Sequence, residues 1–113
     1  MLTLKLNEAF SIEHRLYHEA AVKKHFPEKW FRLERMHILG QSDLKFHAFV
    51  HWLMFREAIN ERKIREIFGQ ALRLIFVVPA HIFSLLPIGN VGTTRASFQG
   101  RMDIPADLKP YFD

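Results

Sequence analysis

The feature that most constrains the fold of this chain is a short break, Gly40-Gln41-Ser42, between two segments with a helical pattern. On each side of the break, apolar side chains recur at three- and four-residue spacing, as they do when one face of a helix is buried. A connection of only about three residues makes the flanking helices antiparallel neighbours. Polar residues near the break that share a face with the apolar positions should therefore meet inside the folded chain.

Four such polar residues flank the break. The segment before it carries Glu34 and His37, and the segment after it carries His47 and His51. Residues three or four positions apart lie on one face of a helix, so the members of each pair point the same way. Both pairs lie within about two turns of the break, and we expect them to face each other across the hairpin. Glu13 falls in the apolar stripe of an earlier helical segment and can close the site from a third side.

These residue types favour a metal site. Neutral imidazole is the commonest metal ligand in proteins, and imidazole combined with carboxylate suits Fe, Zn, Mn, Co or Ni. Burying several such groups without a cation would be costly. We predict that a divalent transition metal binds to a set of five residues: Glu13, Glu34, His37, His47 and His51. Di-iron bundles carry Glu-x-x-His twice, whereas this chain carries it once, so a mononuclear site and a dinuclear site completed by other groups both stay open.

The remaining histidines are better explained by ordinary structural positions than by metal binding. His14 and His18 also have ligand spacing, and His25 follows, but their neighbours are charged and indicate a solvated face. His81 stands alone beside Pro79, and we interpret it as a core or interfacial histidine. The charged residues Glu57, Arg62, Lys63 and Glu66 are typical of ordinary surface pairs.

The periodicity along the chain predicts a single all-α domain over residues 1–113. Four helices are expected near residues 7–25, 27–39, 43–60 and 61–86, with Ser42 or Asp43 capping the third. They would form an antiparallel hairpin bundle, with tetratricopeptide-like hairpins as one option. The irregular tail, residues 87–113, should pack on the helices through its apolar residues Phe98, Met102, Ile104, Leu108 and Tyr111.

The run from Leu74 to Ile88 tests whether the chain meets a membrane. It is about 15 residues long, whereas a spanning helix needs about 20. We expect a buried helix that bends at Pro79, because an internal proline removes a hydrogen bond and crowds the preceding turn. A peripheral membrane protein that uses this run stays open as a third interpretation.

Charge and composition exclude some classes of partner and ligand. The net charge is +4, and the basic residues are interleaved with acidic ones, so no nucleic-acid partner is expected. The chain has no cysteine, which leaves neither disulfides nor thiolate ligands. The first ten residues lack the apolar core of a secretory signal, and we expect a cytoplasmic protein.

Four segments carry a resemblance to a known family. They read LERMHILGQ (Leu33 to Gln41), HAFVHWLM (His47 to Met54), LPIGNVGTTRAS (Leu86 to Ser97) and MDIPADL (Met102 to Leu108). With them the chain resembles small bacterial proteins grouped as domain of unknown function 3703. The resemblance places the two residue pairs of the hairpin on family motif positions and leaves the first-helix histidines outside them. The third segment departs from the family pattern at Val91, Thr93, Thr94 and Arg95, and the grouping itself implies no mechanism.

The sequence thus predicts a small helical protein that binds a transition metal, with metal handling and metal-dependent chemistry both open. The alternative is a helical-hairpin adaptor, in which the polar cluster is a structural hydrogen-bond network. Its binding surface would lie near Phe26, Trp30 and Phe31. A protein partner or a homo-oligomer fits either interpretation.

Overall fold

A computed structural model of the chain describes residues 1–97 and 100–113. The helices are α1 (Leu4–Val22), α2 (Phe26–Gly40), α3 (Leu44–Asn60) and α4 (Ile64–Ile82), followed by the 3-10 helix η1 (Lys109–Phe112). The described residues contain no strand. The predicted all-α fold is confirmed.

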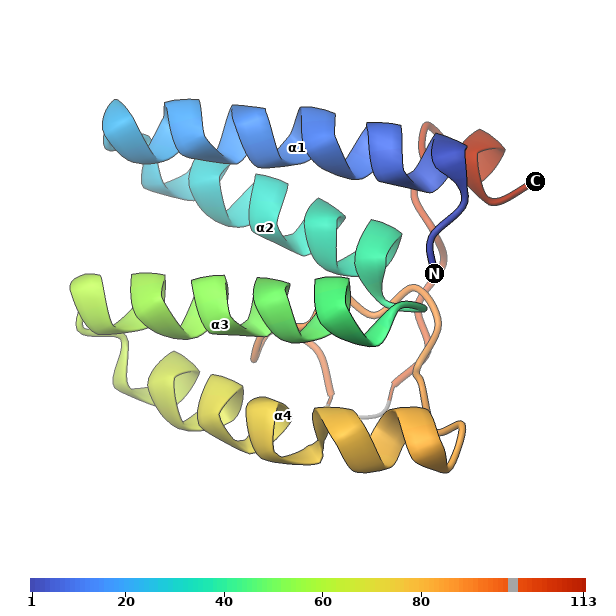
Figure 1. Ribbon diagram of the computed structural model, residues 1–113. Coiled ribbons are helices and arrows are strands. Elements are labelled where there is room, and N and C mark those ends of the chain that lie inside the picture. The colour runs from blue at the N-terminus through green and yellow to red at the C-terminus, as the bar shows by residue number, and fades with distance from the viewer. Residues whose placement is uncertain (98–99) are drawn as a thin grey trace.

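The four long helices stack as a row of antiparallel hairpins (Figure 1). α1 packs on α2, α2 on α3, and α3 on α4, while α1 and α4 occupy opposite ends of the row. The row is therefore open rather than closed into a ring of four. The segment after α4 crosses back over the helices and ends beside the start of α1, where η1 contacts α1.

Local chemistry explains where the helices begin and end. The Asp43 side chain caps α3, accepting hydrogen bonds from the backbone amides of Lys45 and Phe46 at 2.9 and 3.3 Å. Arg62 adopts a φ of 56°, which a right-handed helix does not allow, so α4 begins at Ile64 and not near residue 61 as predicted. Ser84 has a φ of 55°, and α4 ends before it, at Ile82.

The hydrophobic core lies between α1, α2 and α3 and is closed by the tail. Its fully buried side chains include Leu33, Met36 and Leu39 of α2 together with Val50 and Met54 of α3. From the tail, Val91 and Leu108 are buried, and Met102, Ile104 and Tyr111 pack against the core. The prediction of a packed tail is confirmed for these residues, whereas Phe98 lies outside the described part of the chain.

The expectation that the run from Leu74 to Ile88 is buried is wrong. Val77 is its one buried apolar side chain, whereas Ile75, Ile82 and Phe83 are 66%, 68% and 69% exposed. The cause is that α4 turns its polar side, and not its apolar side, toward α3. Within the described residues, no helix combines the length and the apolar character that crossing a bilayer requires.

Candidate metal centre

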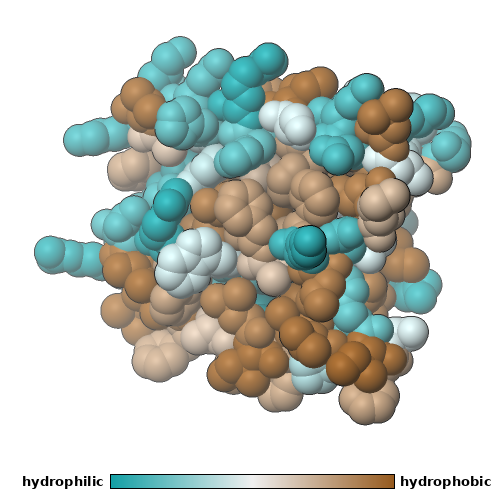
Figure 2. Space-filling model, viewed as in Figure 1, coloured by the Kyte–Doolittle hydropathy of each residue, from teal (hydrophilic) through white to brown (hydrophobic). Residues whose placement is uncertain are grey.

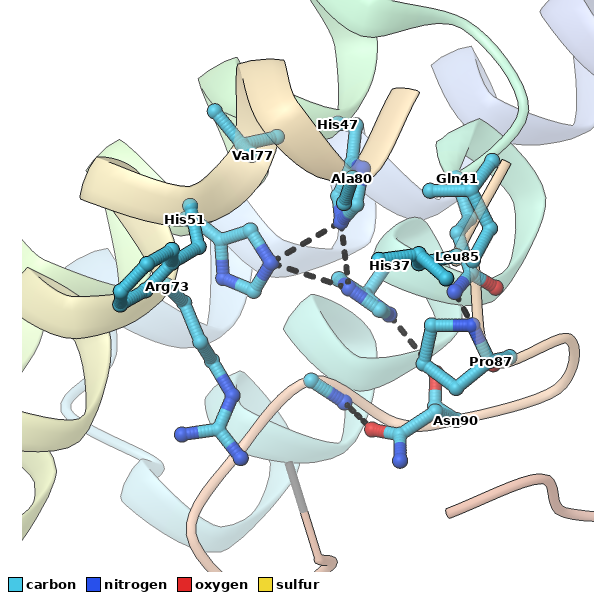
Figure 3. A pocket seen from close by; sticks show the side chains of 13 residues that line it. His37, Gln41, His47, His51, Arg73, Val77, Ala80, Leu85, Pro87 and Asn90 are labelled. Atoms are coloured by element: carbon cyan, nitrogen blue, oxygen red, sulfur yellow. Dashed lines mark hydrogen bonds between the residues drawn. The ribbon is translucent and has the colours of Figure 1, made fainter. Parts of the chain in front are cut away.

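Three histidines of the α2–α3 hairpin lie close together, next to the C-terminal half of α4. The Nε2 atom of His37 lies 3.1 Å from the Nε2 atoms of both His47 and His51, which lie 3.0 Å from each other. All three side chains are buried. Figure 3 shows the three rings pointing toward one centre from α2 and α3. We call His37, His47 and His51 the histidine triad.

The hydrogen bond on the far side of His37 fixes its tautomer. Its Nδ1 lies 2.7 Å from the backbone carbonyl oxygen of Asn90. A carbonyl oxygen only accepts, so Nδ1 carries the proton and donates it. In the neutral imidazole the Nε2 atom then carries no proton, and its lone pair faces the other two histidines.

The tautomer of His51 is fixed in the same way through an amide. Its Nδ1 lies 2.6 Å from Oε1 of Gln70. The orientation of that amide follows from its other end, where Nε2 donates to the Glu66 carboxylate at 2.7 Å and to the Gly92 carbonyl at 2.8 Å. Gln70 must therefore present its oxygen to His51, which donates from Nδ1 and leaves its Nε2 bare.

The third histidine is oriented by another imidazole. Nδ1 of His47 lies 2.9 Å from Nε2 of His81, a residue of α4. Each of the three outer nitrogens thus has a partner supplied by α4 or by the loop after it. Such outer contacts hold metal-binding imidazoles in place and set which nitrogen is available.

Burial keeps the histidine triad uncharged. Desolvation, reinforced by the neighbouring His51 and His81, lowers the pKa of His47 from 6.5 to about 3. Desolvation also lowers the pKa of His51 to about 4, with Arg73 adding to the shift and the hydrogen bond to Gln70 opposing it. The pKa of His37 lies well below 6.5 for the same main reason. Neutral imidazole is the form that binds metal ions.

The triad has the dimensions of a facial ligand set. With their Nε2 atoms 3.0–3.1 Å apart, the three histidines lie close enough together to bind one ion between them. They would leave at least one coordination position of that ion free of protein donors. The buried histidine triad could therefore hold a metal ion.

The two carboxylates predicted as ligands lie outside the triad. Glu13 accepts from Arg35 at 2.6 Å and from Arg32 at 3.0 Å, both on α2. Glu34 shares a helix face with His37, but Thr93 and Arg95 hold its carboxylate at 2.5 and 2.8 Å. The structure therefore brings together three of the five predicted residues. Neither carboxylate lies where a ligand of the predicted site would, because Glu13 binds two arginines and Glu34 binds a threonine and an arginine.

The first-helix histidines are separate from the triad, as expected. His18 is exposed, but the expectation of a solvated face is wrong for His14, which is half-buried and packs its ring among aromatic neighbours, with Phe49 5.5 Å away between centroids. The expectation of surface pairs at Glu57 and Glu66 is wrong, because both are buried. Glu57 accepts from Tyr17 at 2.5 Å, and Glu66 accepts from Gln70.

The loop after α4 packs directly against the triad. Asn90, which is 1% exposed, accepts from the Gly92 amide through Oδ1 and donates through Nδ2 to the carbonyls of Ser97 and Gly100. Gly92 has a φ of 85°, and a Cβ atom there would lie 2.5–2.8 Å from ring atoms of His37. Position 92 therefore requires glycine for two reasons: the positive φ, and the lack of space for a side chain beside the imidazole.

A small cavity borders the triad. Its volume is about 50 Å³, and all three triad histidines contribute to its wall. The other walls are mainly apolar and come from α4 and the segment that follows it. They include Phe76, Val77, Ala80, Leu85 and Pro87. The space is large enough for a few water molecules or one small ligand.

Sequence reasoning missed three residues that hold the triad: Gln70, His81 and Asn90. A signal existed for two of them, because Gln70 and His81 share a helical face with Val77. The exposed apolar residues Phe68, Leu72 and Ile75 lie on the opposite face of α4. Asn90 lies in the family-like segment from Leu86 to Ser97, but nothing in that segment indicates that its carbonyl reaches a histidine 53 positions earlier in the chain.

Comparison with known proteins identifies a family. A family model described as a protein of unknown function (DUF3703) matches residues 4–112. Searches among curated proteins and among solved structures found no match.

Proposed function

The chain belongs to the DUF3703 family, whose description states no activity, and we propose from its site that it binds one divalent transition metal ion. The ligands would be the Nε2 atoms of His37, His47 and His51. Glu13 and Glu34 are left out because arginine and threonine side chains already engage them.

One observation carries the proposal. His37 and His51 both have their proton on Nδ1, yet their bare Nε2 atoms lie only 3.1 Å apart. Two lone pairs at this distance in a buried site repel each other unless a cation or a proton lies between them. The depressed pKa values of His37 and His51 argue against an added proton at neutral pH, and neutral His47 has at most one Nε2 proton to share between the two lone pairs. A divalent cation satisfies all three nitrogens at once.

Three protein donors with a remaining open position are typical of catalytic rather than structural zinc-type sites. The adjoining cavity can hold water or another small ligand at that open position. A bound ion would lower the pKa of such a water and act as a Lewis acid. No described side chain stands out as a general base, so we propose the metal site and its open position without assigning a reaction.

The test is elemental analysis of untagged protein purified without chelator, followed by titration of the chelator-treated protein with Co²⁺. We expect close to one ion per chain and a cobalt absorption spectrum typical of nitrogen ligands. The His37→Ala/His51→Ala double variant should lose both. The His14→Ala/His18→Ala variant is a matched control, since that pair has the same four-residue spacing as His47 and His51 but lies apart from the triad.

The opposite result would be decisive as well. Wild-type protein that contains no metal, and that is not thermally stabilised by any of Zn²⁺, Co²⁺, Ni²⁺, Mn²⁺ or Fe²⁺, would refute the proposal. The triad would then be a buried hydrogen-bond network of the kind required by the adaptor alternative. The open position has its own test, because azide added to the cobalt-loaded protein should change the spectrum only if an exogenous ligand can reach the ion.

A further inference from the structure

α4 reverses the usual orientation of an amphipathic helix. The side that faces α3 and the tail carries Glu66, Gln70 and Arg73, all buried and hydrogen-bonded, with Val77 as its buried apolar residue. The opposite side is apolar and faces outward. Phe68, Leu72, Ile75 and Ile82 are 69%, 50%, 66% and 68% exposed. Among the described helices, α4 packs only on α3.

The outward residues follow a regular repeat. Phe68, Leu72, Ile75, Pro79 and Ile82 are separated by four, three, four and three positions. We call these five residues the α4 stripe. This alternation is the spacing at which two helices interlock side chains along a shared seam. The α4 stripe thus has the residue spacing of a helix that packs against a second helix. None of the described helices packs against this side of α4.

The area of the exposed face suits a stable interface. Around the stripe, further exposed apolar residues extend the surface toward the end of α4 and beyond it, and Figure 2 shows hydrophobic side chains gathered along the lower part of the molecule, where α4 lies. Eight side chains contribute: Phe68, Leu72, Ile75, Val78, Ile82, Phe83, Leu85 and Ile88. If each exposes about 100 Å², the face offers roughly 800 Å², the area that each partner buries in a standard-size complex. Monomers rarely expose apolar patches of this size.

We propose that the α4 stripe binds the same stripe of a second copy of this chain, with the two α4 helices antiparallel. The stripe contains no charged residue, so pairing it with itself brings no like charges together. In the antiparallel arrangement Ile75, the middle member of the stripe, lies at the two-fold axis. Arg65 is exposed at the start of α4 and would then approach the C-terminal end of the second copy's α4, where the helix dipole favours a cation.

A lipid surface fits the same face less well. A helix that lies in a membrane interface carries Lys and Arg on the side opposite its apolar face, where they meet the lipid headgroups. On α4 that opposite side is buried against α3 and the tail, and its one arginine, Arg73, donates to backbone carbonyls of Thr93 and Ala96. The face therefore favours another helix as its occupant.

The first test measures mass in solution. Wild-type protein should sediment as a dimer over a range of concentrations, and Ile75→Glu should halve the apparent mass while keeping the far-UV circular dichroism spectrum. Val22→Glu is the matched control, since Val22 is similarly exposed, at 70%, but lies on α1, and this variant should remain dimeric. A wild-type monomer at every concentration would overturn the proposal, as would a dimeric Ile75→Glu variant. A monomer that binds anionic vesicles through Ile75 would overturn it in favour of lipid.

The second test measures orientation. The chain has no cysteine, so a single introduced thiol reports one position. A short bismaleimide should link two copies of Ile75→Cys, which meet at the two-fold axis. It should not link two copies of Phe68→Cys, which an antiparallel pair separates by roughly 21 Å along the helices, at 1.5 Å per residue. Equal cross-linking of both variants would refute the antiparallel arrangement.

Discussion

Replacing Gly92 with alanine should weaken both the fold and the proposed metal site. Gly92 has a φ of 85°, and a Cβ atom at this position would lie 2.5 Å from Cδ2 and 2.8 Å from Nε2 of His37. Two costs follow. Holding an L-residue in the left-handed region costs roughly 1–2 kcal/mol, and forcing a methyl group into packed surroundings costs about 1–3 kcal/mol.

The two costs together predict that Gly92→Ala lowers the free energy of unfolding by about 2–5 kcal/mol, a large part of the total for a domain of this size. The assay is urea unfolding of chelator-treated protein, followed by far-UV circular dichroism. Because the new methyl group displaces the His37 ring from its place in the triad, Co²⁺ affinity should also fall, by about 10- to 100-fold as when an outer-shell contact is lost.

Ser97→Ala is the control in the same loop, because Ser97 is exposed and contributes its backbone carbonyl, not its side chain, to Asn90. It should change stability by no more than about 0.5 kcal/mol. If Gly92→Ala unfolds at the wild-type urea concentration, the loop does not pack against His37, and the structural reasoning for the triad fails at that point.

Three further predictions test the polar contacts. Gln70→Leu removes the acceptor that orients His51, and Co²⁺ affinity in a spectroscopic titration should fall about 10- to 100-fold, whereas Arg65→Ala, an exposed position on the same helix, serves as the neutral control. In metal-free protein the pKa values of His47 and His51, about 3 and 4, lie below the unfolded value of 6.5, so the unfolded chain binds more protons than the folded protein between pH 6.5 and 4. The free energy of unfolding should therefore fall as the pH falls, and at pH 5 the loss is on the order of 2 kcal/mol per histidine. Urea unfolding at several pH values measures this loss, and a free energy of unfolding that does not change with pH would contradict the buried triad. Asp43→Ala removes the cap of α3 and should cost about 1 kcal/mol of unfolding free energy in the same assay, whereas Asp43→Asn should retain most of it.

The sequence predicted the triad because its three histidines are close together along the chain. His37 and His47 are ten positions apart, and His51 lies one helical turn beyond His47, so a short turn and helical periodicity suffice to bring them together. Glu34 satisfies the same periodicity, yet it lies outside the triad. Its partners Thr93 and Arg95 are 59 and 61 positions away, and no local pattern reveals that they reach its carboxylate first.

The burial of α4 was misjudged for a different reason. An apolar run is usually buried, and the run from Leu74 to Ile88 is almost wholly apolar. What the run could not show is that Gln70 and Glu66 have hydrogen-bond partners on the inner side, in His51 and Thr94. Those contacts stabilise the polar side of α4 against the rest of the molecule and leave its apolar side outward.

The separation between the triad and its outer contacts also bears on the order of folding. The three nitrogens come from one hairpin, whereas their outer partners lie 19, 34 and 53 positions away along the chain. Closing a short loop costs less entropy than closing a long one, so the α2–α3 hairpin can assemble its nitrogens before α4 and the tail arrive. An ion captured at that stage would hold the hairpin together as a nucleus, and the later segments would then fix the orientation of its ligands.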